Sequence, residues 1–260
     1  MRWGRGLQSS LYKPADAQAQ VEHELRSDIR KKMLRIDIIT IFPKMFSPVL
    51  DESIMKRAQA KRLVDFRVHD LRDFSKDAHR KVDDRPFGGG PGMVMTPQPL
   101  VDAVKRIKGR RKARVIYMCP GGTTFTQAKA KALAKEKNII LICGHYEGID
   151  ERVREMVVDE SISVGDYVLT GGELPAMVVV DSLVRLIPGV LGKEASLEDE
   201  SFEHGLLEYP QYTRPADFCG KKIPPVLLSG NHKAVKEWRN EQAVARTKKF
   251  RPDLSRKSCA

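Results

Sequence analysis

Hydrophobic and polar positions follow two periods from residue 34 onward, one typical of strands and one typical of helices. Runs rich in β-branched residues predict buried strands at Leu34–Phe42, Ala113–Cys119 and Asn138–Cys143, and the alternating run Leu63–His69 predicts a half-exposed strand whose His69 faces solvent. Apolar residues at helical spacing predict helices that begin at Ser47 and that span Pro99–Lys108, Gln127–Lys137 and Lys233–Phe250. Strands that alternate with helices indicate an α/β domain with a mainly parallel sheet.

Two glycine-bearing loops organise the stretch between residues 138 and 188. The strand Asn138–Cys143 breaks at Gly144, and a second loop runs from Ser163 to Pro175. Each loop follows a strand-like run and precedes a helix-like one. The strand ends at Pro120, Gly144 and Gly165 are therefore expected at one edge of the sheet, where backbone amides can face a ligand. The pattern predicts a small-molecule site in a crevice at this edge.

The long segment Asp70–Met95 breaks all periodicity, and its part Asp83–Met93 is dense in glycine and proline. A loop of this length is usually functional or disordered. Glycine and proline between charged residues favour a backbone shaped to lie close to a ligand, with a flexible connector as the alternative. The glycine spacing fits neither a Walker A loop nor a dinucleotide fingerprint, so the loop does not indicate ATP or NAD.

The segment Pro175–Ile187 is apolar on nearly every face. This pattern predicts a helix that is buried in the domain or against a partner subunit. Its Arg185 either pairs with Asp181, four residues earlier, or faces a charged ligand, and the residues alone favour the pair. The acidic connector Gly189–Leu206 follows, and charge runs of this kind are usually solvated.

The net charge of the chain indicates the kind of partner that it binds. The 260 residues hold 46 Lys and Arg against 34 Asp and Glu, a formal net charge of +12, which favours an anionic partner such as nucleic acid over the alternative of a merely basic protein. Residues 205–260 hold twelve Lys and Arg against five Asp and Glu, with Tyr209, Tyr212, Trp238 and Phe250 among them. Such a surface suits a phosphate backbone and unstacked bases, although for Trp238 alone inward packing is favoured.

The cysteines and the first residues indicate the cellular location of the protein. Cys119, Cys143, Cys219 and Cys259 are too widely spaced for a zinc ribbon or finger, which predicts reduced thiols, a cytoplasmic location and no metal site. No run approaches the ~20 consecutive apolar residues that span a bilayer, so no membrane partner is expected. Residues 1–32 are polar and mixed, and are expected to be a poorly ordered extension or to contain a short docked helix around Ala17–Arg30.

Five ungapped motifs carry a family resemblance. They are Asp83–Met93, Cys143–Arg152, Gly165–Ala176, Ile187–Gly192 and Tyr212–Pro215. In order and with compatible spacing, from about Met33 to Leu254, the chain closely resembles the bacterial tRNA (guanine-N1-)-methyltransferase family, TrmD. The resemblance implies an α/β fold of the SPOUT class, with a parallel sheet, a deep trefoil knot and a small helical C-terminal domain. It also implies a homodimer with composite active sites.

The same resemblance implies that the chain has four segments. It implies an N-terminal extension at 1–32, a SPOUT methyltransferase domain at 33–190, an interdomain linker with the catalytic carboxylate at 191–204, and a basic helical tRNA-binding domain at 205–260. The implied methyl donor is S-adenosylmethionine, held largely by backbone. The matching positions are Tyr117, Met118, Cys119, Pro120, Gly144, Tyr146, Glu147, Val164, Gly165, Asp166, Tyr167, Val168, Leu169, Gly171, Gly172 and Pro175.

The implied reaction methylates N1 of the guanosine at tRNA position 37, just 3′ of the anticodon. N1 of neutral guanine carries a proton, so a carboxylate must remove it while a cation stabilises the charge near O6. Arg185 matches the family's catalytic arginine, which reverses the preference drawn from the residues alone. Many family members read Glu-Asp-Ser-Phe where this chain reads Asp-Glu-Ser-Phe from residue 199, so Glu200 stands where an aspartate base is usual, with Asp199 as the alternative.

Contacts to RNA are implied at four positions: Asp83, Arg85, Ser196 and Arg214. A role for Mg²⁺ does not follow from the sequence. Two other functions stay open at this point. One is a SPOUT methyltransferase that acts on another RNA nucleotide, and the other is a non-catalytic RNA-binding protein in which the glycine loops are scaffold.

Overall fold

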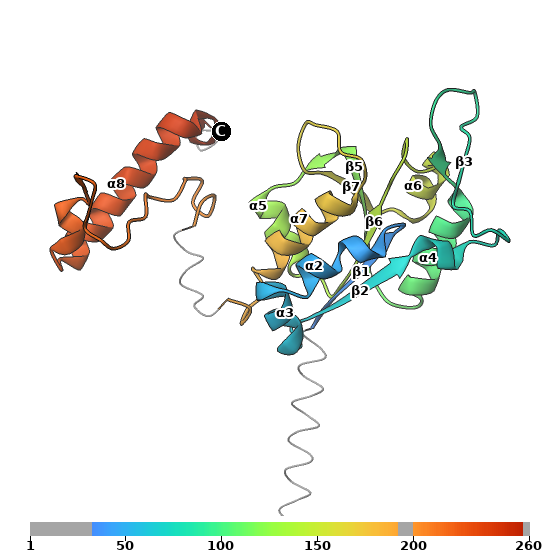
Figure 1. Ribbon diagram of the computed structural model, residues 1–260, viewed down its shortest axis with the longest axis horizontal. Coiled ribbons are helices and arrows are strands. Elements are labelled where there is room, and N and C mark those ends of the chain that lie inside the picture. Colours follow the sequence, from blue (N-terminus) through green and yellow to red (C-terminus); the bar gives the residue numbers. More distant parts are fainter. Residues whose placement is uncertain (1–32, 192–199, 257–260) are drawn as a thin grey trace, which may run out of the picture. The chain divides into compact units, whose positions relative to one another are not determined.

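The computed structural model describes residues 33–191 and 200–256 (Figure 1). The chain divides into two compact units, Met1–Val190 and Leu191–Ala260. Several sequence-based predictions lie outside the described residues: the poorly ordered extension at 1–32 with its alternative of a docked helix around Ala17–Arg30, Ser196 as an RNA contact, and Asp199 as the alternative base. Among the residues within the described ranges, no helix is long and apolar enough to cross a membrane.

A five-stranded sheet forms the centre of the first unit. Its strands are β1 (Leu34–Thr40), β2 (Val64–Asp70), β5 (Arg114–Thr124), β6 (Asn138–Cys143) and β7 (Glu160–Ser163). They pair in the order β2-β1-β6-β5-β7, and every pairing is parallel. The predicted α/β class and the parallel sheet are confirmed. Because all strands run the same way, their carboxyl ends lie at one edge of the sheet.

Helices cover both faces of this sheet (Figure 1). One face carries α2 (Ser47–Leu50), α3 (Ser53–Ala60), α5 (Gln127–Leu133) and α7 (Glu173–Val184), after the short turn η1 (Pro43–Met45). The other face carries α4 (Pro97–Lys108) and α6 (Glu151–Val157). Alternate residues of β6 point into these two cores, with Ile139 and Leu141 in one and Ile140 and Ile142 in the other. Strand β6 is therefore apolar on both faces, as its sequence predicted, whereas β2 is only partly buried, as its alternating sequence predicted.

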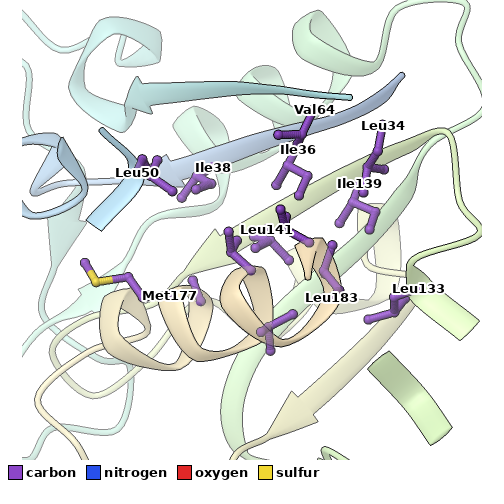
Figure 2. Close-up of a cluster of buried hydrophobic side chains, with 14 of the residues drawn as sticks. Leu34, Ile36, Ile38, Leu50, Val64, Leu133, Ile139, Leu141, Met177 and Leu183 are labelled. Carbon is purple, nitrogen blue, oxygen red and sulfur yellow. The ribbon is translucent and has the colours of Figure 1, made fainter. Parts of the chain in front are cut away.

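The helix α7 lies directly against the middle of the sheet. Figure 2 shows Met177 and Leu183 of this helix facing Leu141 and Ile139 of β6. Leu183 is fully buried, and burying one such side chain stabilises the fold by roughly 1.5–3 kcal/mol. The outer side of α7 is also apolar, because Leu174 is 50% exposed and Val178 is 49% exposed. Within one unit, the helix is thus covered on one side only.

Strand β5 continues further than the sequence predicted. Pro120–Gly122 was expected to end it, but pairing with β7 resumes at Thr123 after an irregularity that begins at Met118. A Cβ atom on Gly122 would lie 2.4 Å from the backbone nitrogen of Ile162. The expectation was wrong because the missing side chain of Gly122 lets the two backbones approach instead of breaking the strand.

Two other segments differ from their predicted shape. The helix expected after Ser47 is two short helices, because Ser53 adopts a positive φ of 47° that interrupts the helical backbone. The long loop after β2 contains a turn, η2 (Leu71–Phe74), and a small antiparallel pair, β3 (Asp83–Asp84) with β4 (Val94–Met95). The glycine-rich sequence therefore closes a hairpin, which projects away from the sheet in Figure 1.

His69 corrects a prediction. It was expected to face solvent, but its Nε2 lies 2.7 Å from Oδ1 of Asp37, a carboxylate that is 1% exposed. Arg35 donates two hydrogen bonds to the same carboxylate, at 2.7 and 2.8 Å. Burial raises the pKa of Asp37, but the hydrogen bonds from His69 and Arg35 together hold it below its ordinary value. His69 is therefore half-buried in a hydrogen-bonded cluster around Asp37, which strand alternation alone did not indicate.

The second unit is built on one long helix, α8 (His232–Phe250), followed by α9 (Pro252–Arg256). Before them lie the short pair β8 (Asp217–Phe218) and β9 (Lys221–Lys222) and the turn η4 (Pro225–Leu228). The side chain of Asn231 accepts a hydrogen bond from the Ala234 nitrogen at 3.1 Å and so caps α8. Thr247, which is buried, accepts a hydrogen bond from the Leu207 nitrogen at 2.8 Å and holds the preceding segment against the helix.

Candidate active site

A cavity of about 240 Å³ opens where the irregular part of β5 meets the carboxyl ends of β6 and β7. It is the crevice that the two glycine loops predicted. Its walls come from the middle of β5, the loop after β6, the loop after β7 and the start of α7. The lining residues are Tyr117, Met118, Cys119, Pro120, Gly144, His145, Tyr146, Glu147, Gly148, Ile162, Ser163, Val164, Gly165, Tyr167, Val168, Leu169, Thr170, Gly171, Gly172 and Pro175.

The two glycine loops cross each other at the cavity. The Gly172 nitrogen donates a hydrogen bond to the Gly144 oxygen at 2.8 Å, and His145 forms a β-bridge with Gly171. A Cβ atom on Gly144 would lie 2.8 Å from the ring of Tyr117. Neither Gly144 nor Gly172 has a positive φ, so glycine is not required at these positions for a turn. Glycine is required because the backbones of the two loops approach each other closely.

The second loop begins with a turn that Ser163 stabilises. Its hydroxyl donates to the Gly165 oxygen at 3.0 Å and accepts from the Gly165 nitrogen at 3.2 Å. Gly165 has φ of 152°, and a Cβ atom there would lie 2.5 Å from the ring of Tyr167. The sequence Ser-Val-Gly-Asp-Tyr thus sets the direction in which the loop leaves β7. The exposed side chains of Tyr167 and Val168 then form the outer wall of the cavity.

Burial sets the protonation of two groups beneath the cavity. It raises the pKa of Tyr117 to about 12, against a smaller opposing effect of a backbone hydrogen bond from Ile149. It also raises the pKa of the Cys143 thiol far above its ordinary value, and the nearby Glu173 carboxylate raises it further. Both groups therefore stay neutral at physiological pH, and neither serves as a nucleophile or a base.

The glycine-rich hairpin packs against the loop after β6, which lines the cavity. The Glu147 nitrogen donates to the Met93 oxygen at 3.0 Å, and the Met95 nitrogen donates to the Gly148 oxygen at 2.9 Å. A Cβ atom on Gly92 would lie 2.3 Å from Oε1 of Glu147, so the hairpin packs tightly on the loop after β6. Burial raises the pKa of Tyr146, and the negative charge of Asp83 raises it further. Asp83 itself is half-buried in β3.

The structure brings together nearly all the residues predicted to bind the donor. Asp166 is the exception, because it is exposed and does not line the cavity. The remaining fifteen predicted positions line it. The structure adds five that the sequence reasoning left out: His145, Gly148, Ile162, Ser163 and Thr170. Their signal in the sequence was their position inside or beside the two glycine-bearing motifs.

The predicted catalytic and RNA-contacting residues are spread more widely. Arg185 is the C-terminal cap of α7 and is half-buried, while Arg85 is exposed in the hairpin. Glu200 belongs to the second unit and is half-buried there. Arg214 is exposed and precedes Pro215 through a cis peptide bond.

Aromatic and basic side chains of the second unit surround a cavity of about 390 Å³. The guanidinium of Arg239 lies 4.6 Å from the ring centre of Tyr209, and the rings of Tyr212 and Trp238 lie 6.4 Å apart. Trp238 is half-buried in this cluster. Its ring is therefore partly packed within its own unit.

In the part of the chain that the structure describes, no group of three or more His, Cys, Asp or Glu side chains is arranged to hold a metal ion. The described cysteines, Cys119, Cys143 and Cys219, are free thiols.

Comparison with known proteins identifies the family of this chain. Residues 34–257 match the family model described as tRNA (Guanine-1)-methyltransferase TrmD. A tRNA (guanine-N(1)-)-methyltransferase from Geobacillus kaustophilus is 60% identical over 222 residues, which are 85% of this chain and 91% of that protein. Proteins of the same name from Ruminiclostridium cellulolyticum and Bacillus cereus are 57% identical over 226 residues (86% and 97% of the two chains) and 56% identical over 223 residues (85% and 91%). The chain therefore belongs to the tRNA (guanine-1)-methyltransferase TrmD family.

Proposed function

We propose that this protein transfers a methyl group from S-adenosylmethionine to N1 of the guanosine just 3′ of the tRNA anticodon. The observation that carries the proposal is the cavity at the crossing of the two glycine loops, in a chain whose relatives are named tRNA (guanine-N(1)-)-methyltransferases. The family model covers both units, so the proposal concerns the whole chain and not only the sheet domain.

The cavity residues fit such a donor. At Gly171 and Gly172 no Cβ atom can be accommodated, which leaves backbone groups at the cavity wall for the polar parts of the molecule. Apolar side chains such as Val164 and Leu169 line the same cavity and suit the adenine ring. When bound, S-adenosylmethionine supplies an electrophilic methyl group on a sulfonium. The residues of this chain must then hold it, exclude water and prepare the acceptor.

Proton removal is the second requirement. As N1 of guanine attacks the methyl group, the N1–H bond breaks and its proton passes to a carboxylate, for which we propose Glu200. The electrons of that bond place negative charge on the base near O6, which the guanidinium of Arg185 would stabilise. Asp199 remains the alternative base.

We further propose that two copies of the chain form each active site. The outer side of α7 exposes Leu174 and Val178, and an apolar surface of this kind favours a partner. The crossing of the glycine loops is consistent with the deep trefoil knot of the SPOUT class. The carboxylate base would then come from the partner subunit.

The tRNA would be held by both units in this proposal. Contacts are proposed at Asp83, Arg85, Ser196 and Arg214, and the net charge of +12 favours a polyanion. The aromatic and basic cluster of the second unit suits the anticodon stem or loop. We also propose a cytoplasmic location, which suits a tRNA-modifying role and in which the described free thiols would be stable.

Methyl transfer from labelled S-adenosylmethionine tests the proposal. The substrates are a tRNA transcript with guanosine after the anticodon and the same transcript with adenosine there. Product with the first and none with the second is expected. Equal product with both would mean that another RNA nucleotide is modified. Donor and tRNA binding with no product would favour a non-catalytic RNA-binding protein.

A further inference from the structure

A buried carboxylate lies directly behind the cavity. Glu173, the first residue of α7, is 2% exposed, although its side chain carries an ionisable group. The hydroxyl of Thr40, at the end of β1, donates a hydrogen bond to Oε1 of Glu173 at 2.7 Å. The same hydroxyl oxygen accepts a hydrogen bond from the Phe42 nitrogen at 2.9 Å. Thr40 therefore orients one carboxylate oxygen and leaves the other, Oε2, facing the loop after β6.

His145 faces that second oxygen. Its Nδ1 lies 3.8 Å from Oε2 of Glu173, too far for a normal hydrogen bond. Among the described residues, this nitrogen is buried and makes no hydrogen bond. The imidazole ring is held by ring contacts, 4.9 Å from Phe42 and 5.1 Å from Tyr146. The ring is thus aimed at the carboxylate but stops short of it.

Gly171 separates the two groups. A Cβ atom there would lie 2.4 Å from Oε2 of Glu173 and 2.5 Å from Nδ1 of His145. Only glycine leaves the path between the imidazole and the carboxylate open. The two side chains also come from different segments. His145 lines the cavity from the loop after β6, and Glu173 lies behind it at the start of α7.

Chemistry decides which atom carries the proton. A bare Nδ1 lone pair would face a carboxylate oxygen and repel it, whereas an Nδ1–H would be attracted to it. A buried carboxylate is costly unless it is paired and hydrogen-bonded. The structure places an imidazole nitrogen before Oε2, and an N–H at this nitrogen is the state that the carboxylate favours.

We propose that His145 and Glu173 are positioning residues whose contact closes into a charge-assisted hydrogen bond when the methyl donor binds. The closure ties the loop after β6 to the start of α7 and fixes both cavity walls around the donor. This inference rests on the proposed function, because it concerns the donor of that reaction. Neither residue is assigned to the methyl transfer itself.

A double-mutant cycle tests the inference on the full-length protein. The variants are His145→Gln, Glu173→Gln and the two together, with S-adenosylmethionine binding measured by calorimetry. Glu173→Gln keeps an acceptor for Thr40, so the fold has its buried hydrogen bond. Each single change is expected to weaken donor binding about tenfold, the worth of one charge-assisted hydrogen bond, and the double change is expected to weaken it no further. Two independent structural defects would instead multiply to about a hundredfold.

Steady-state kinetics give the second readout. The KM for the donor should rise while kcat at saturating donor stays near the wild-type value, because the contact affects donor binding and not the chemical step. His145→Arg supplies a guanidinium donor that can reach Glu173, and is expected to restore donor binding to within about threefold of wild type. The control is Glu155→Gln on the exposed side of α6, which should change nothing.

The outcomes separate the two proposals. Absence of donor binding by the wild-type protein contradicts the proposed function before any variant is compared. Normal wild-type binding with multiplicative losses, or with no rescue by His145→Arg, overturns the positioning pair alone. Thermal unfolding of each variant shows whether a loss of binding comes from a loss of fold.

Discussion

Gly172 lies so close to the backbone of Cys143 that a Cβ atom on it would stand 2.8 Å from the Cα atom of Cys143. The nearest atoms are backbone, which cannot move aside as a flexible side chain can. Cys143 ends the central strand β6, and Gly172 is the residue before α7. The crossing of these two residues therefore fixes where α7 begins relative to the sheet.

The first prediction concerns this crossing. Gly172→Ala should reduce the free energy of unfolding by about 1–3 kcal/mol, since the added methyl group has no space. It should also abolish measurable donor binding. Urea unfolding and calorimetry check the two effects. Gly121→Ala is the control, because nothing lies within 4 Å of the position that its Cβ atom would take. Equal stability of the two variants would contradict the close approach.

The second prediction concerns Tyr117 at alkaline pH. Its pKa rises from 10.0 to about 12 on folding, so the folded state favours the neutral phenol. The stabilisation is complete below the unfolded pKa and is lost as the pH rises from 10.0 toward 12. Over that range the wild type should lose roughly 2–3 kcal/mol more than Tyr117→Phe in urea unfolding. A parallel pH dependence of the two proteins would show that Tyr117 titrates normally. Tyr212→Phe, at a half-exposed ring, should behave as wild type.

The third prediction concerns Asp37 at acid pH. Its pKa is lower in the folded protein than the ordinary 3.8, so its stabilisation is present above that value and is lost as the pH falls through the folded pKa. Asp37→Asn should cost about 3–5 kcal/mol at neutral pH, because Arg35 loses a buried partner. The variant should also lose less stability on acidification. Asp65→Asn removes a more exposed pair with Arg67 and should cost less than about 1 kcal/mol, as urea unfolding can measure.

The fourth prediction concerns the base. Glu200→Gln should lower kcat by about 10²–10⁴ with little change in the KM for tRNA, since the amide cannot accept the N1 proton. Single-turnover methyl transfer is the measurement. Glu203→Gln is the matched change three residues away and should retain activity. A normal rate for Glu200→Gln with a large loss for Asp199→Asn would assign the base to Asp199.

The fifth prediction concerns the exposed side of α7. Val178→Asp places a charge on an apolar surface and should convert a dimer into monomers that lack methyl transfer. Sedimentation or light scattering measures the mass. Met156→Asp, at an exposed methionine of α6 on the other face of the sheet, should leave the mass unchanged. A monomeric wild type would contradict the composite site.

Local pattern predicted most of the sheet, because strands such as β1 and β6 are largely buried and read as apolar runs. The prediction failed where the environment of a residue depends on another residue far away in the sequence. The continuation of β5 depends on Gly122 meeting Ile162, and the hydrogen bond of His69 depends on Asp37 in the neighbouring strand. Neither partner lies within the local window that sets periodicity.

In the candidate site too, local sequence predicted some features, and others depend on contacts between distant segments. The glycine loops and the family motifs pointed to nearly every residue that lines the cavity. The contact between His145 and Glu173 could not be predicted, because it forms only where the two loops cross at Gly171. Asp166 does not line the cavity, which the matched motif could not indicate because it carries no information on which side chains turn outward, and its contact with the donor stays a prediction.

The sheet order has a consequence for folding. The central strands β1 and β6 pair although about a hundred residues separate them, and α7 packs on both only after the chain has reached the edge strand β7. Pairings between distant segments form slowly, since the intervening chain must be closed first. The segment that completes the cavity is therefore among the last to dock during refolding. During refolding, donor binding should therefore recover later than the circular dichroism signal of the helices. The delay between the two measures how long the final docking step takes.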